Sequence, residues 1–170
     1  NLKKEDNLIF VVGKTYGHIY QSIFAREIIN EKKGPPPEVS LFNEKNNGHN
    51  ILKLINEGIV ESAHDVSLGG IIIALSKMAI KGKKGFRLNK IKTLINKFEY
   101  YFGEDQARYI VEVKSDNLKQ FKKILDNNSI HYDELGIVTK NEIIIDKEPI
   151  LHIDELIESN TNWLVNYMEK

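Results

Sequence analysis

The chain has 170 residues, which is enough to bury the core of one domain, and its 41% hydrophobic and 28% charged residues are typical of a globular protein. Lys plus Arg and Asp plus Glu are equal at 24 each, and this balance argues against nucleic-acid and membrane partners. The absence of cysteine excludes disulfides, thiolate catalysis and zinc–thiolate sites. With no secretion signal and no apolar run near the ~20 residues that span a bilayer, we expect a cytoplasmic protein.

The first half of the chain alternates apolar runs with turn residues. The patterns predict strands over 8–13 and 59–63 and helices over 21–30, 40–58 and 71–80. Gly34 and the prolines after it cannot continue a helix, so 31–38 is predicted to be a loop. Ser40 is placed to cap the helix that follows.

The second half continues the alternation and predicts the fold class. Strands are predicted over 85–88, 109–113, 130–138 and 141–145, with a polar helical stretch after the first of them and helices over 116–125 and 155–168. Asp116 and Asp154 are placed to cap the last two helices, and a turn at 139–140 joins the last two strands. We therefore expect an α+β fold, an α/β sandwich in which helices pack on a mixed sheet, formed by residues 1–170 as a single domain.

The segment from Ser62 to Gly70 is the strongest candidate for a functional site. His64, Asp65 and Ser67 lie where a predicted strand ends in a turn, and a predicted helix begins directly after it. Free N–H groups at a helix start attract phosphate, and a glycine pair lets the backbone approach it. In that case Asp65 would bind a magnesium ion and Ser67 a phosphate. The same residues are also consistent with a structural turn, in which Asp65 or Ser67 caps the helix and the glycines allow close packing.

Gly103–Gln106 is a second candidate loop, placed just before a predicted strand. Its two adjacent acids, Glu104 and Asp105, and the amide of Gln106 are suited to meet a metal, a ribose or an amide. Charged loop residues are more often simply solvated, and the residues alone leave both interpretations open.

The loop from Gly13 to Ser22 is a third candidate. Its Gly-Lys-Thr start does not fit a phosphate-binding P-loop, because the glycine that this motif requires at position 8 is Leu8. The loop still holds Lys14, His18 and two glycines, which are suited to approach an anion. No pair of histidines in the chain has the spacing of a metal site.

Taken together, these segments resemble the C-terminal half of the phosphoribosylformylglycinamidine synthases. The Ala-His-Asp-Val-Ser-Leu-Gly-Gly and Phe-Gly-Glu-Asp-Gln-Ala-Arg-Tyr stretches carry most of the resemblance. It runs in family order over nearly the whole chain, through 12–22, 34–37, 63–70, 74–79, 102–109, 135–138 and 162–168.

The resemblance implies a C-terminal domain of the aminoimidazole ribonucleotide synthetase-like superfamily and a fragment of a longer enzyme. That enzyme is a ligase that amidates formylglycinamide ribonucleotide with ATP, Mg²⁺ and glutamine-derived ammonia. The implied partners are upstream ATP-binding domains of the same enzyme, a glutaminase subunit and a small accessory subunit. No catalytic residue is expected in this chain. The implied nucleotide- or phosphate-binding residues are Ser22, His64, Asp65, Ser67, Gly69, Gly70, Gly103, Glu104, Asp105 and Gln106, with Asp65 as a metal ligand.

Two departures from the family pattern favour a structural role for this domain's own site. Leu68 stands where the family usually has an acid, and Tyr20-Gln21-Ser22 stands where it often has Gly-Gly-Ser. Two alternatives therefore stay open. One is a non-catalytic scaffold or nucleotide-holding domain, and the other is the C-terminal domain of an aminoimidazole ribonucleotide synthetase or another superfamily member.

Overall fold

The apolar run near the N-terminus forms the central strand of a sheet. In the computed structural model, which describes residues 1–169, strand β1 (Leu8–Val12) pairs antiparallel with β4 (Tyr109–Val113) on one side and with β5 (Tyr132–Thr139) on the other. Its last four residues are buried, because helices cover both faces of the strand at this point.

The sheet has seven strands in the order β2-β4-β1-β5-β3-β6-β7. The remaining strands are β2 (Val60–Asp65), β3 (Gly85–Leu88), β6 (Glu142–Ile145) and β7 (Glu148–His152). All neighbours are antiparallel except β3 and β6, which run parallel. The predicted mixed sheet is therefore confirmed.

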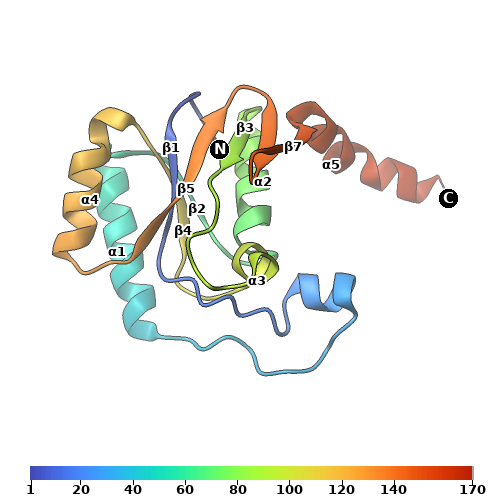
Figure 1. The fold of residues 1–170 in the computed structure, drawn as a ribbon, viewed down its shortest axis with the longest axis horizontal. Coiled ribbons are helices and arrows are strands. Elements are labelled where there is room, and N and C mark those ends of the chain that lie inside the picture. The colour runs from blue at the N-terminus through green and yellow to red at the C-terminus, as the bar shows by residue number, and fades with distance from the viewer. Residues whose placement is uncertain (170) are drawn as a thin grey trace.

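Helices pack on both faces of this sheet (Figure 1). Along β1, Phe10 and Val12 join one core with α1 (Leu41–Asn56) and α4 (Leu118–Asn127). Ile9 and Val11 join the opposite core with α2 (Gly70–Gly82) and α3 (Lys97–Phe102). The alternation follows from the two-residue period of a strand and confirms the predicted sandwich.

Two local predictions are confirmed in atomic detail. The Ser40 side chain accepts a hydrogen bond from the backbone N–H of Asn43 and so caps α1. The predicted buried helix is α2, whose Ala74, Leu75 and Met78 are almost fully buried. In Figure 1 the loop after β1 runs past one end of the sheet toward α1.

Other boundaries differ from the sequence prediction. The helix predicted over 21–30 is shorter, because helical structure runs over 23–29, and its Ala25–Ile29 part is a π-helical turn, η1. The polar stretch after β3 has no regular element before α3. Asp116 does not cap a helix but lies in a short 3₁₀ turn, η2 (Ser115–Asn117). The last helix, α5 (Ile153–Met168), is capped by His152 rather than by Asp154, because His152 and Glu155 form a reciprocal capping box.

The C-terminal strands also differ from the predicted hairpin. Strand β6 does not pair with β5, because β3 lies between them. It pairs instead with β7, which the sequence prediction missed. The turn between these strands, Asp146 and Lys147, has positive φ angles of 53° and 73° without the glycine that usually signals such a turn. Pro149 is tolerated in β7 because this strand is the edge of the sheet.

The last helix extends away from the body of the domain (Figure 1). Its first turns contact the core through Ile153, Leu156 and Ile157, but Trp163 is 60% exposed. No helix within residues 1–169 is long and apolar enough to cross a membrane.

Candidate functional site

The three candidate loops meet at one end of the sheet, and Glu104 joins two of them to the third. One carboxylate oxygen of Glu104, Oε1, accepts a hydrogen bond from the N–H of Ile23 and another from the N–H of Gly69, both at 2.8 Å. Gly69 is the N-cap residue of α2. The Glu104 carboxylate therefore binds one N–H group, that of Gly69, at the helix start that the sequence offered to a phosphate.

The Asp105 carboxylate likewise binds backbone N–H groups, in its case those of the loop after β1. Its carboxylate accepts hydrogen bonds from three successive backbone N–H groups, those of Tyr16, Gly17 and His18, at 2.9–3.0 Å. Successive N–H groups pointing into one concavity form an anion-binding nest. In this molecule the bound anion is the side chain of Asp105, which is only 5% exposed.

A buried arginine neutralises this arrangement. The Arg108 guanidinium lies 3.5 Å from the Asp105 carboxylate and donates to the carbonyl of Gly103, at 2.6 Å, and to the hydroxyl of Thr15, at 3.2 Å. It is 1% exposed. Burial lowers the pKa of Arg108, and the negative charge of Asp105 opposes that shift. We call Glu104, Asp105 and Arg108 the internal clamp.

The glycine pair at the start of α2 serves close packing. Gly70 has a φ of +70°, and a Cβ atom on it would lie 2.7 Å from the carbonyl oxygens of Tyr101 and Gly103. A larger residue would push the helix away from the 101–103 segment. This contact matches the structural interpretation of the Gly69-Gly70 pair.

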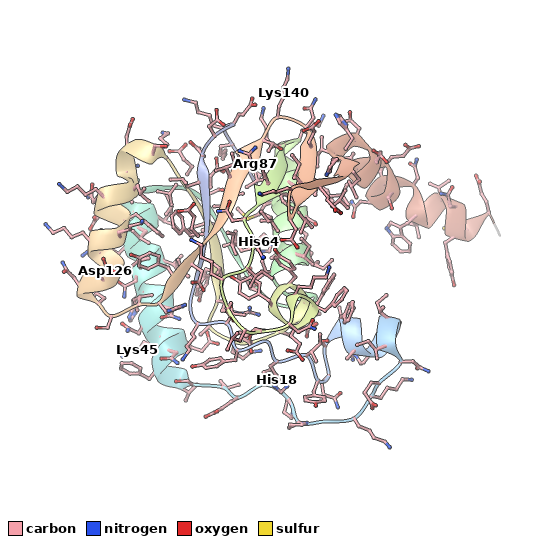
Figure 2. All side chains as sticks on the ribbon, in the orientation of Figure 1. His18, Lys45, His64, Arg87, Asp126 and Lys140 are labelled. Carbon is pink, nitrogen blue, oxygen red and sulfur yellow. The ribbon has the colours of Figure 1, made fainter. Side chains whose placement is uncertain are left out.

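The other predicted site residues do not converge on this clamp. Ser22 is buried, and its hydroxyl accepts from the N–H of Ala25 at the start of η1. The His64 ring nitrogen Nδ1 lies 2.6 Å from the carbonyl oxygen of Asp65 and 3.4 Å from its carboxylate. Neither Asp65 nor Ser67 caps α2, which has no side-chain cap. Figure 2 shows His64 nearer the middle of the molecule and His18 on the loop beneath it.

The fit of a magnesium ion to Asp65 is poor. Among residues 1–169 there is no group of three or more His, Cys, Asp and Glu side chains that could hold a metal ion. The Asp65 carboxylate is exposed, and among residues 1–169 only the His64 ring lies within ion-pair distance of it. Because magnesium prefers several oxygen ligands, the donors of this chain do not form a complete site.

A pocket of about 490 Å³ opens beside the internal clamp. It lies between the loop after β1, the start of α1 and the 105–107 segment. The polar residues that line it include His18, Ser40, Asn43 and Gln106. Sequence reasoning identified Ser40 and Asn43 only as parts of a helix start, since nothing in their spacing places them opposite Gln106.

Helix α1 also fixes the far wall of this pocket. Glu44 accepts from the N–H of Ala107 at 2.9 Å, and Asn47 donates to the carbonyl of Ala107 at 2.8 Å. These contacts hold Ala107 at a φ of 57°, which is uncommon for a residue with a Cβ atom. Helix α1 therefore positions the 105–107 side of the pocket, a role that the sequence motif alone did not reveal.

Comparison with known proteins shows the family to which the chain belongs. The family model for the AIR synthase related protein, C-terminal domain, matches residues 4–147. The chain is 63% identical over 169 residues to the phosphoribosylformylglycinamidine synthase subunit PurL of Pelagibacter ubique, and 37% identical over 169 residues to that of Bartonella quintana. Each alignment covers 99% of this chain but only 23% of the relative.

Solved structures share the fold at low sequence identity. A structure of Thermotoga maritima PurL complexed with FGAR has a TM-score of 0.72 at 19% identity, covering 92% of this chain and 29% of that one. A thiamine-monophosphate kinase from Stenotrophomonas maltophilia has a TM-score of 0.58 at 13% identity, covering 87% of this chain and 52% of that one. At these identities the likeness shows the fold alone.

Proposed function

Because the chain belongs to the family of AIR synthase related proteins, as their C-terminal domain, we propose that it is one domain of a phosphoribosylformylglycinamidine synthase. The observation that carries the proposal is the 63% identity to a PurL subunit across 99% of the chain. It favours this enzyme over an aminoimidazole ribonucleotide synthetase. In this proposal the enzyme is a cytoplasmic ligase.

The proposed reaction needs parts that lie outside this chain. ATP activates the amide oxygen of formylglycinamide ribonucleotide, and ammonia then displaces phosphate to give the amidine. Preceding domains of the same subunit would hold ATP and Mg²⁺, since within residues 1–169 Asp65 is not part of a group of three or more His, Cys, Asp and Glu side chains that could hold a metal ion. A glutaminase and a small accessory subunit would complete the assembly, which is consistent with the existence of a Thermotoga maritima structure named PurLQS.

Within that enzyme we assign this domain a bracing role. Five backbone N–H groups in these loops, which a phosphate would otherwise accept from, are bound by Glu104 and Asp105 of the chain itself. The internal clamp holds three loops in one rigid end of the sheet, where it can support a neighbouring domain. This observation favours the scaffold alternative for the domain's own site, and it agrees with a catalytic role for the whole enzyme.

A chimeric subunit tests the proposal. The Pelagibacter ubique PurL subunit would receive this chain in place of the 169 residues that it matches, and amidine formation would be measured with ATP and an ammonia source. We expect activity close to that of the parent subunit. As a matched control, the corresponding domain of the thiamine-monophosphate kinase, at 13% identity to this chain, should give an inactive chimera. A soluble, correctly assembled chimera without amidation activity would refute the proposal.

A further inference from the structure

A second pocket lies where the sheet narrows, away from the pocket beside the internal clamp. Of the eight residues in β5, only 136–139 pair with β3. The first half of β5 therefore has a single strand neighbour, β1. The loop after β3 passes this uncovered edge and is tied to it by the N–H of Asn89, which donates to the carbonyl of Leu135 at 2.7 Å. A pocket of about 480 Å³ remains, which is within the range of small-molecule sites.

Positive side chains reach this pocket from separate parts of the chain. Lys14 follows β1, Lys90 and Lys92 lie on the loop after β3, and Lys122 belongs to α4. None of these four lysines forms an ion pair with any residue in the described range 1–169. The chain as a whole has a net charge of zero, so this excess of positive charge is local.

The two acids that line the pocket already have partners. Asp133 lies 3.1 Å from the Nε2 atom of His131, and Glu134 accepts a hydrogen bond from the side chain of Asn89 at 3.3 Å. They therefore do not neutralise the lysines by direct contact. Four lysines face two acids around one recess, which is the balance expected of a site for a multiply charged anion.

The wall of the pocket provides apolar surface. Tyr100 and Tyr101 line it with ring centroids 5.5 Å apart, and both are almost buried. The Tyr101 hydroxyl has no hydrogen-bond partner among residues 1–169. That oxygen atom is itself buried from solvent, so the two tyrosines offer a ligand apolar ring surface rather than a polar contact. Ile91, Ile95 and Leu135 complete the apolar wall.

We propose that this pocket binds a phosphorylated small molecule of about mononucleotide size. Its phosphate would lie among Lys14, Lys90, Lys92 and Lys122, and its apolar part would pack on the tyrosine wall. Lysine binds phosphate as a flexible point charge, and several lysines match the two charges of a phosphate monoester better than the single charge of a carboxylate. The recess is confined and the surrounding chain is neutral, so an extended nucleic acid does not fit.

Lysine footprinting of the chimeric subunit tests this site. The subunit would be acetylated with a limiting reagent in the presence of AMP, pyrophosphate or adenosine, and modification would be read at each lysine by mass spectrometry. AMP and pyrophosphate should protect the four pocket lysines, and uncharged adenosine should not. Lys119 and Lys123, on the same helix as Lys122 but outside the pocket, should be unaffected. Equal labelling with and without AMP and pyrophosphate, or equal protection by adenosine and AMP, would overturn the proposal.

A pair of variants localises the effect. Lys90→Gln with Lys92→Gln should weaken the AMP protection of Lys14 and Lys122 by about tenfold, since two of four cationic contacts are lost. Lys119→Gln with Lys123→Gln makes the same charge change outside the pocket and should leave the protection as it was. Unchanged protection in the first variant would overturn the assignment. Urea denaturation of both variants reports that the subunit is folded, and amidation activity of the unsubstituted chimera separates this test from that of the proposed function.

Discussion

Two regions of the molecule that look equally polar in sequence differ in whether their polar groups have partners. At the internal clamp, the Asp105 carboxylate accepts from three backbone N–H groups and faces a buried arginine. At the lysine pocket, none of the four ammonium groups has an ion-pair partner among residues 1–169, although the Lys14 ammonium lies 5.0 Å from the centroid of the Tyr16 ring. The charged groups of the clamp hold loops together, whereas the lysine ammonium groups of the pocket have no ion-pair partner within residues 1–169.

The difference shows that a conspicuous motif is not the same as an open site. The clamp residues stand in the family motifs, yet the anion in the nest is already supplied by the chain. The lysine pocket has no motif, because its residues come from four separate segments. Satisfaction of hydrogen bonds, which only the structure shows, decides which region can accept a ligand.

The largest effect is expected from removing the positive charge of the clamp. Arg108→Met would leave the carboxylate of Asp105 buried without its counter-ion, and the loss should be about 3–5 kcal/mol in the free energy of unfolding. Urea denaturation of the 170-residue chain measures it. Arg87→Met, which changes an exposed arginine on β3, is the matched control and should cost far less. If both variants lose the same small amount, the clamp is not an energetic centre of the fold.

Much of the fold could be predicted from the sequence, because local patterns determined it. The period of the apolar residues identified β1, α2 and β4, and a capping serine identified the start of α1. What could not be predicted depended on distant partners. Strand β7 is held by pairing with β6, and β6 by pairing with β3, which lies more than fifty residues earlier in the chain.

The candidate site shows the same limit. The sequence identified three separate candidate loops, and in the structure Glu104 joins them. It could not show that Glu104 and Asp105 point inward, since acids in a loop are usually solvated. That orientation depends on Arg108, whose burial follows from the packing around it rather than from its neighbours in sequence.

An intermediate effect is expected at alkaline pH from the tyrosine wall of the lysine pocket. Burial, followed by the charge of Asp146, raises the pKa of Tyr101 from the ordinary 10.0 to about 12. Burial also raises the pKa of Tyr100. A raised pKa in the folded state means that the neutral phenol is favoured there. The stabilisation of the folded state by the neutral Tyr101 phenol is therefore complete below pH 10 and is lost as the pH rises toward 12.

The decrease in the free energy of unfolding that is due to Tyr101 should reach about 2–3 kcal/mol at the upper end of this pH range. Urea denaturation at stepped pH, compared between the parent chain and Tyr101→Phe, isolates it from the titration of lysines. The variant should be as stable as the parent at neutral pH, because the lost hydroxyl has no partner, and should show a shallower alkaline decline. Identical alkaline declines would show that Tyr101 is not buried as described.

The smallest effect is expected where the clamp keeps its geometry but loses a charge. In Glu104→Gln the amide oxygen can still accept from the N–H groups of Ile23 and Gly69, so the cost should be about 0.5–1.5 kcal/mol. Glu104→Ala removes the acceptor altogether and should cost more, with faster hydrogen exchange at those two amides. The alanine variant also tests whether the carboxylate replaces an anion. If it does, added phosphate should restore part of the lost stability in Glu104→Ala and have no such effect in Glu104→Gln, where the acceptor remains. Phosphate that stabilises both variants equally would show that the helix start is not where it binds.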